Sequence, residues 1–234
     1  MSTIIKEFSR FAQQYNEYNM IQAQVAKRVV ERLPDDCYTS ILDIGCGSGQ
    51  VFKNIENKSI QFNTFTAFDS SSNMLALHPQ AKNIKKICAD FNDRSFRDLL
   101  DKRYDLLLSS SSLQWSSDLD FTLKSIAELS HTFHAAIFTS GTFKTLHQVA
   151  QISSPIYTAK EVQESILKHY AEVDFELHSY TLHFDSVRDM FRYIKKSGVS
   201  SGEKKLSYKE TKTLMKSYPL EYLEFEVLFI EAKM

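Results

Sequence analysis

Apolar residues recur at every fourth position near the start of the chain, at Ile21, Val25, Val29 and Leu33. Polar residues separate them, and Pro34 follows directly. This spacing places the apolar side chains on one face of a helix, and proline does not continue a helix. The pattern therefore predicts an amphipathic helix that ends before Pro34.

Five short apolar runs follow, separated by stretches that are able to form helices. The runs are continuously apolar rather than alternating, which is typical of strands covered on both faces of a parallel sheet. They occupy residues 40–45, 65–69, 86–90, 104–109 and 135–140. Their spacing indicates repeated β-α-β units and predicts an α/β fold with a Rossmann-like, doubly wound sheet.

The second half of the chain has a different pattern. Residues 174–184 and 221–233 alternate apolar with polar side chains, which indicates antiparallel strands or strands exposed on one face. Residues 187–196 and 208–216 have helical spacing. We therefore expect a mostly parallel sheet with an antiparallel C-terminal strand, and an inserted helical cover.

Composition narrows the class of protein. The 234 residues are 43% hydrophobic and 24% charged, as in a globular protein, and the formal net charge of −1 predicts no general attraction to nucleic acid or membrane. Cys37, Cys46 and Cys88 form no C-x-x-C pair, which argues against a disulfide framework or a zinc site. The start lacks a signal-peptide pattern and no apolar run has membrane-spanning length, so a cytoplasmic location is expected.

A glycine-rich turn follows the first buried run, in the sequence ILDIGCGSGQ. Gly45, Gly47 and Gly49 allow a tight turn and a close approach of the backbone to a ligand, and a helix opening near Gln50 would direct free amides toward that ligand. Nicotinamide enzymes usually carry G-x-G-x-x-G, which has a different spacing. The observed G-x-G-x-G, preceded by Asp43, resembles motif I of class I S-adenosylmethionine-dependent methyltransferases.

Acidic residues also end the next two predicted strands. Asp69 ends the second run, close to the roughly 20-residue offset after the glycine turn at which a carboxylate reaches ribose hydroxyls. Asp90 ends the third run and is followed by Phe91. Because ligands bind at the carboxyl ends of parallel strands, these residues are expected to share one site. Asp105 precedes its strand, so we expect it at the opposite edge in a structural role.

Segments along nearly the whole chain resemble the malonyl-[acyl-carrier protein] O-methyltransferases of biotin synthesis. The residues that match lie in the opening segment and after the fourth strand: Phe8, Arg10, Tyr15, Gln22, Leu113, Gln114 and Trp115. Residues 146–148, 181–201 and 222–233 are similar to later segments of that family, in the same order. The chain departs from the family pattern at Ser110 and Ser111, which replace an Asn-Leu type pair.

This resemblance implies a site for S-adenosylmethionine. Asp69 would bind the ribose, Asp90 and Phe91 the adenine, and Tyr15 and Gln22 the methionine end. The complete set of candidate cofactor residues is Tyr15, Gln22, Asp43, Gly45, Cys46, Gly47, Gly49, Asp69, Ser70, Met74, Asp90, Phe91, Ser110 and Ser111. Within this set we interpret Cys46 as a space-filling residue, because no basic partner stands nearby to activate its thiol.

The resemblance also implies an acceptor, the free carboxylate of a malonyl thioester on acyl-carrier protein or coenzyme A, which is methylated for pimeloyl and biotin synthesis. A carboxylate with a pKa of about 4 is already deprotonated at pH 7, so this acceptor needs no general base. Tyr15 and Trp115 would position the reactants, and no metal is expected. The candidate substrate residues are Gln114, Trp115, His147, Arg192 and Lys195.

Several of these predictions have alternatives. Trp115 is also the kind of aromatic residue that closes a core, and His147 is also interpretable as a structural histidine. Arg192 and Lys195 would attract an acidic carrier protein, but a solvated helix face has the same pattern. For the whole chain, the alternatives are a methyltransferase acting on another small carboxylic acid or phenol, and a cofactor-binding protein without catalysis.

We expect one methyltransferase domain over residues 1–234, because no repeat or long linker interrupts the chain. Its predicted parts are N-terminal entrance helices at 1–34, a cofactor-binding core at 35–145, substrate-side helices with a strand at 146–220, and a last strand at 221–234. The sequence does not predict an oligomeric state.

Overall fold

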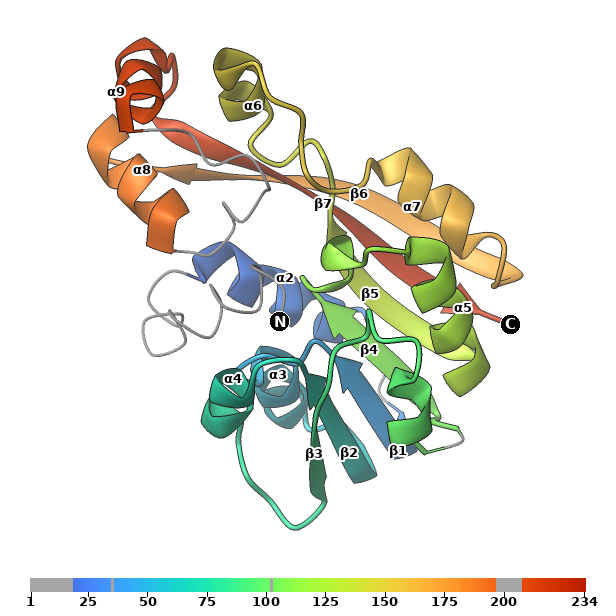
Figure 1. Ribbon diagram of the computed structural model, residues 1–234. Helices are drawn as coiled ribbons and strands as arrows, with labels where there is room; N and C mark the ends of the chain where they lie inside the picture. The colour runs from blue at the N-terminus through green and yellow to red at the C-terminus, as the bar shows by residue number, and fades with distance from the viewer. Residues whose placement is uncertain (1–18, 35, 102, 197–207) are drawn as a thin grey trace.

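The computed structural model describes residues 19–34, 36–101, 103–196 and 208–234. Within these ranges, the centre of the fold is a seven-stranded sheet with the order β3-β2-β1-β4-β5-β7-β6 (Figure 1). The strands are β1 (Cys37–Ile44), β2 (Gln61–Asp69), β3 (Ile84–Cys88), β4 (Leu106–Ser110), β5 (Thr132–Phe138), β6 (Glu172–His183) and β7 (Tyr222–Lys233). Strands β1 to β5 are parallel, and β7 is antiparallel to both of its neighbours. The predicted sheet is therefore confirmed.

Helices cover both faces of the sheet. One hydrophobic core joins the sheet to α2 and α3 and continues under α8 and α9, and a second core joins it to α5 and α7. The helices are α2 (Met20–Glu31), α3 (Gln50–Lys58), α4 (Ser72–Leu77), α5 (Leu119–Leu129), α6 (Lys144–Ala150), α7 (Ala159–Ile166), α8 (Val187–Lys196) and α9 (Tyr208–Ser217), with 3₁₀ turns η1 (Phe96–Leu99) and η2 (Leu113–Trp115). Two cores on opposite faces are what the continuously apolar strands require.

The elements closest to the predicted site follow the sequence pattern. In α2, the side chains of Ile21, Val25 and Val29 are buried, and the helix ends before Pro34, as predicted. In β1, Leu42 and its apolar neighbours have no exposed surface. The glycine turn that follows β1 is therefore carried by a strand covered on both faces.

Helices α6, α8 and α9 lie around one end of the β6–β7 pair (Figure 1). Met190 and Tyr193 of α8 and Leu214 of α9 are buried in the same core as Leu223 and Phe225 of β7. These helices are the cover that the sequence predicts. The division of the chain near residues 34, 145 and 220 stays a prediction.

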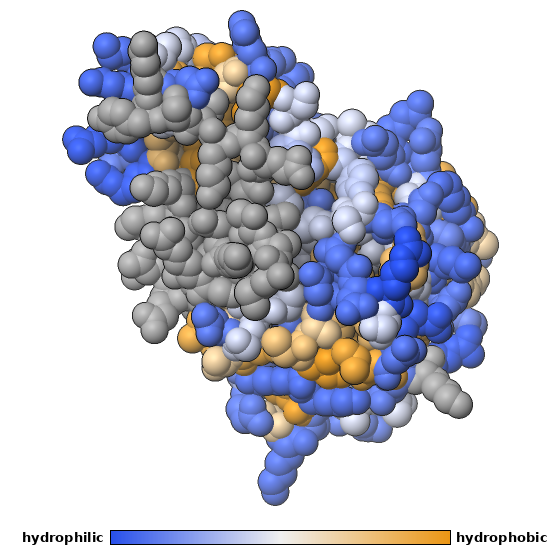
Figure 2. Space-filling view, viewed as in Figure 1, coloured by the Kyte–Doolittle hydropathy of each residue, from blue (hydrophilic) through white to orange (hydrophobic). Residues whose placement is uncertain are grey.

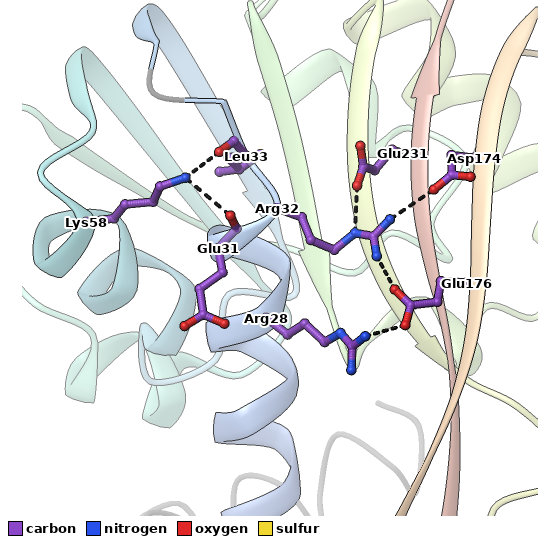
Figure 3. A network of polar contacts seen from close by, with 8 residues as sticks. All are labelled: Arg28, Glu31, Arg32, Leu33, Lys58, Asp174, Glu176 and Glu231. Carbon is purple, nitrogen blue, oxygen red and sulfur yellow. Dashed lines mark hydrogen bonds and ion pairs between the residues drawn. The ribbon is translucent and has the colours of Figure 1, made fainter.

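Helix α2 is joined to the antiparallel end of the sheet by a charged network (Figure 3). The guanidinium of Arg32 contacts the carboxylates of Glu231 at 2.6 Å, Asp174 at 3.0 Å and Glu176. Arg28 contacts Glu176 as well. Because the side chains of Arg28, Arg32 and Glu176 are partly buried, their ion pairs are screened less than a surface ion pair and fix the direction of α2 over the sheet.

The surface seen in Figure 2 is mainly hydrophilic, with smaller apolar groups between the charged side chains. In the described part of the chain, no helix is long and apolar enough to cross a membrane. The cytoplasmic location stays a prediction.

We expect the protein to lose stability in acid because of His134 in β5. Its side chain is buried, and burial lowers its pKa to about 4; Glu231 opposes this shift, and Lys233 and Arg32 add to it. The folded protein therefore keeps His134 neutral while the unfolded chain takes up a proton below its ordinary value of 6.5. Stability should fall by about 3 kcal/mol as the pH drops from 6.5 to 4.

The measurement is urea unfolding between pH 7 and pH 4. We expect His134→Gln to flatten the dependence of unfolding free energy on pH, because glutamine does not titrate. His131→Gln is the matched control, since the side chain at that position is exposed. An unchanged slope in His134→Gln would show that other groups cause the acid sensitivity.

Candidate functional site

The turn between β1 and α3 is built from residues with positive φ. Gly45, Gly47 and Gly49 have φ of 74°, 53° and 85°, in the left-handed region that other residues rarely adopt. The amide of Gly45 donates to the carbonyl of Phe68 at 2.7 Å, which holds the turn against the end of β2. Helix α3 begins at Gln50, as the sequence predicts.

The three glycines have different neighbours. A Cβ atom at Gly45 would collide with the side chain of Ser112, and one at Gly49 would lie 2.7 Å from Cδ of Pro79. At Gly47 the neighbour is the terminal methyl of Met74, at 3.3 Å. At Gly45 and Gly49, glycine is required because neighbouring protein atoms leave no room for a side chain. This reason differs from the expectation that a ligand contacts the backbone at all three glycines. Gly47 is left as the glycine where a ligand can approach the backbone.

Asp69 links the glycine turn to the start of α4. Its carboxylate accepts hydrogen bonds from the amides of Gly47 at 2.9 Å and Ser71 at 2.8 Å. Each carboxylate oxygen can accept a second hydrogen bond, so capacity remains for ligand hydroxyls. Burial raises the pKa of the Asp69 carboxyl, and the two amide hydrogen bonds oppose that rise.

Asp43 is fully buried beside this turn, and neither carboxyl oxygen has a hydrogen-bond partner among the described residues. Burial raises the pKa of Asp43 well above its usual range, and the charge of Asp69 adds to the rise. Leaving a buried carboxyl without a partner is costly, so a ligand with donors or a positive charge would compensate it. S-adenosylmethionine has both, and the site therefore fits that cofactor.

Cys46 lies between the glycines and is buried. Burial raises the pKa of its thiol, and the charges of Asp43 and Asp69 act in the same direction. The thiol therefore stays protonated at neutral pH, which supports its interpretation as a space-filling residue.

Asp90 follows β3 and lies close enough to Asp69 to raise the pKa of that carboxyl. Its Oδ1 atom accepts from the amide of Asn92 at 2.9 Å and from the Asn92 side chain at 3.0 Å. Phe91, which was expected beside an adenine ring, is packed into the core with 9% of its surface exposed. Ser70 is half-buried next to Asp69.

Four consecutive serines join the end of β4 to the glycine turn. The hydroxyls of Ser109 and Ser112 both donate to the carbonyl of Ile44, at 2.8 and 2.9 Å. Ser110 and Ser111 are half-buried, and Ser111 has a φ of 62°. The middle pair, Ser110 and Ser111, is among the predicted cofactor residues and the outer pair is not, although the run of four small hydroxyl residues at the end of a buried strand is visible in the sequence.

After this serine run, Gln114 is buried and Trp115 is partly buried, and each has a buried polar atom without a partner among the described residues. The amide nitrogen of the Gln114 side chain donates to the carbonyl of Ser111 at 2.8 Å, and its Oε1 atom has no partner among the described residues. The indole nitrogen of Trp115 is likewise buried without one. On α2, Gln22 is buried with an unpartnered Oε1 atom in the same described part of the chain.

The remaining predicted residues lie apart from this cluster. His147 is half-buried in α6, where burial lowers its pKa. Arg192 is exposed on α8 and contacts Asp189 at 2.6 Å, which favours a solvated helix face. Tyr15 and the side chain of Lys195 lie outside the described residues.

Asp105 lies at the opposite edge of the sheet from this site. It accepts from the amides of Thr39 at 2.6 Å and Ser40 at 3.1 Å, next to the start of β4. This is the structural role expected from its place before the strand.

Comparisons with known proteins agree with this geometry. A methyltransferase domain family matches residues 42–131. The malonyl-[acyl-carrier protein] O-methyltransferase of Priestia megaterium is 26% identical over 84% of this chain and 80% of its own length. That of Pseudescherichia vulneris is 28% identical over 82% of this chain and 78% of its own length.

Solved structures share the fold. The YcgJ protein of Bacillus subtilis has a TM-score of 0.65 at 11% identity, covering 90% of this chain and 97% of its own. A phosphoethanolamine N-methyltransferase of Haemonchus contortus, solved with S-adenosylhomocysteine, has a TM-score of 0.62 at 14% identity and covers all of this chain and 60% of its own. Residues 42–131 therefore match a methyltransferase domain, and the chain as a whole is similar to the malonyl-[acyl-carrier protein] O-methyltransferases.

Proposed function

We propose that the chain transfers a methyl group from S-adenosylmethionine to the free carboxylate of a malonyl thioester, carried by acyl-carrier protein or coenzyme A. The product is a methyl ester that enters pimeloyl and biotin synthesis. The observation that carries the acceptor assignment is the similarity to malonyl-[acyl-carrier protein] O-methyltransferases over more than four-fifths of the chain. Esterification makes the chain end neutral, which suits it to apolar pockets that exclude a charge.

The cofactor supplies a methyl group on a sulfonium. In the proposed site, Asp69 accepts from the ribose hydroxyls, Asp90 from the adenine amino group, and Asp43 compensates the positive methionine end. The backbone of Gly47 would contact the adenosyl group. Support for these roles comes from the unpartnered oxygens of Asp43 and the spare acceptor capacity of Asp69.

The acceptor side is proposed to lie at the ends of β4 and β5. There, the methionine end would be bound by Ser110 and Ser111. The malonyl group would be bound by Gln114 and Trp115. A carboxylate acceptor is already deprotonated at neutral pH, so the task of these side chains is to orient it in line with the methyl group and exclude water. Orientation of this kind supplies up to about 7 to 11 kcal/mol in well-aligned systems.

The direct test incubates the full chain with labelled S-adenosylmethionine and a panel of acceptors. The panel contains malonyl-acyl-carrier protein, malonyl-coenzyme A, free malonate, another small carboxylic acid and a phenol. We expect a methyl ester on a malonyl thioester, detected by mass spectrometry. Product on the free acid or phenol would instead support a different small-molecule acceptor, and cofactor binding without any product would contradict catalysis.

Asp69→Ala is expected to weaken binding of S-adenosylhomocysteine by about 1 to 3 kcal/mol, because the variant loses the ribose contacts. Isothermal titration calorimetry measures this. Asp105→Ala is the matched control, since Asp105 also accepts from two backbone amides but lies at the opposite edge of the sheet. Equal affinity in the wild type and Asp69→Ala would remove Asp69 from the site.

A further inference from the structure

We propose that Tyr157 is a positioning residue that holds the η2 turn, and with it the Trp115 indole, at the acceptor side of the site. This inference depends on the proposed function only in that the surface beside Trp115 is called the acceptor side. Tyr157 precedes α7 and lies more than forty positions after Trp115, so no local sequence pattern links the two. The link depends on the fold, which brings the segment before α7 against the turn after β4.

Tyr157 connects the loops at the ends of two neighbouring parallel strands. Its hydroxyl donates to the carbonyl of Ser116 at 2.8 Å. Its own carbonyl accepts from the amide of Ser140 at 2.8 Å. Ser116 directly follows Trp115 after β4, and Ser140 follows β5. The two loops that would line the acceptor side are therefore joined through one residue.

The same turn is held from the cofactor side by Asn92. Its side-chain oxygen accepts from the amide of Ser117 at 2.7 Å, and its side-chain nitrogen lies 3.4 Å from the carbonyl of Trp115. Asn92 in turn donates to Asp90. The backbone on the carboxyl side of Trp115 is thus fixed between a cofactor-side contact and the Tyr157 contact.

The Trp115 indole itself lacks a polar anchor. Its nitrogen is buried and has no hydrogen-bond partner among the described residues. The direction of the ring is therefore set by its packing and by the backbone on either side. Removing the hydroxyl of Tyr157 would leave the carbonyl of Ser116 without that donor and would loosen the turn on the acceptor side.

The test variant is Tyr157→Phe, which keeps the ring and removes the hydroxyl. Tyr170→Phe is the matched control, because the Tyr170 hydroxyl is buried with no hydrogen-bond partner in the described residues and its ring stacks on Phe133. Trp115 is the single tryptophan of the chain, so intrinsic fluorescence reports its surroundings directly. We expect acrylamide quenching of Trp115 to increase in Tyr157→Phe and to stay at the wild-type level in Tyr170→Phe.

The kinetic measurement separates positioning from general stability. In Tyr157→Phe we expect kcat/KM for the malonyl thioester to fall about five- to tenfold, with the Kd for S-adenosylhomocysteine within twofold of the wild type. If the wild type methylates no malonyl thioester, the proposed function fails, and the quenching result alone then decides the role of Tyr157. Wild-type quenching in Tyr157→Phe would overturn the inference, as would an equal loss of cofactor affinity and turnover.

Discussion

Gly45→Ala is expected to lower the free energy of unfolding by about 2 to 5 kcal/mol and to abolish measurable cofactor binding. Two costs add at this position. A residue with a Cβ atom is strained at a φ of 74°. The added carbon would also collide with Cβ and Oγ of Ser112. Because Ser112 donates to the carbonyl of Ile44, moving it away would break one of the two hydroxyl contacts that hold the ends of β1 and β4 together.

Urea unfolding and titration with S-adenosylhomocysteine measure the two effects of Gly45→Ala. The double variant Gly45→Ala with Ser112→Gly is the control, because it removes the colliding side chain and leaves the backbone strain. We expect it to recover part of the lost stability. Unfolding of the single variant at the wild-type urea concentration would contradict the steric argument.

Asp43→Asn is expected to have opposite effects on stability and on ligand affinity. Folding raises the pKa of Asp43, so the unfolded chain loses this proton at a lower pH than the folded protein does. The unfolding free energy therefore falls as the pH rises from the unfolded pKa to the folded one. Asparagine does not titrate, and at pH 7 the cofactor-free variant should be more stable by about 1 kcal/mol.

Affinity for S-adenosylhomocysteine should fall about 10- to 100-fold in the same variant, because the carboxylate that compensates the methionine end is lost. Unfolding at several pH values tests the expected gain in stability, and calorimetric titration tests the expected loss of affinity. Asp69→Asn is a useful comparison, because Asp69 already accepts two backbone hydrogen bonds. We expect the Asp69→Asn protein to be less stable than the wild type. A less stable Asp43→Asn with unchanged affinity would show that Asp43 is structural.

The parts of the fold that the sequence predicted are those with a local signal. Continuous apolar runs identify buried strands because both faces must be covered, and the alternation in β6 and β7 identifies the antiparallel end. The glycine turn and the acids at strand ends are also local, because they follow their strands directly. The edge where these acids gather could therefore be predicted before any contact was known.

Contacts between distant segments could not be predicted in this way. The joining of Arg28 and Arg32 to Glu176 spans more than 140 positions, and no periodicity encodes it. Arg192 has the same sequence pattern whether it binds a substrate or pairs with Asp189, and the structure places it in an exposed ion pair. Charge patterns indicate that a face is polar, but its partner depends on which elements pack nearby.

Within the glycine turn, too, some features are predictable from local sequence and others depend on contacts with distant segments. Residue order alone indicates that Gly45, Gly47 and Gly49 form a tight bend, since each tolerates a positive φ. Which of them faces another part of the protein depends on the positions of Ser112 and Pro79, which reach the bend from the turn after β4 and from the loop after α4. Local sequence patterns indicate backbone geometry and burial. The neighbours of a side chain depend instead on the order of the strands in the sheet, which is established only when the chain folds.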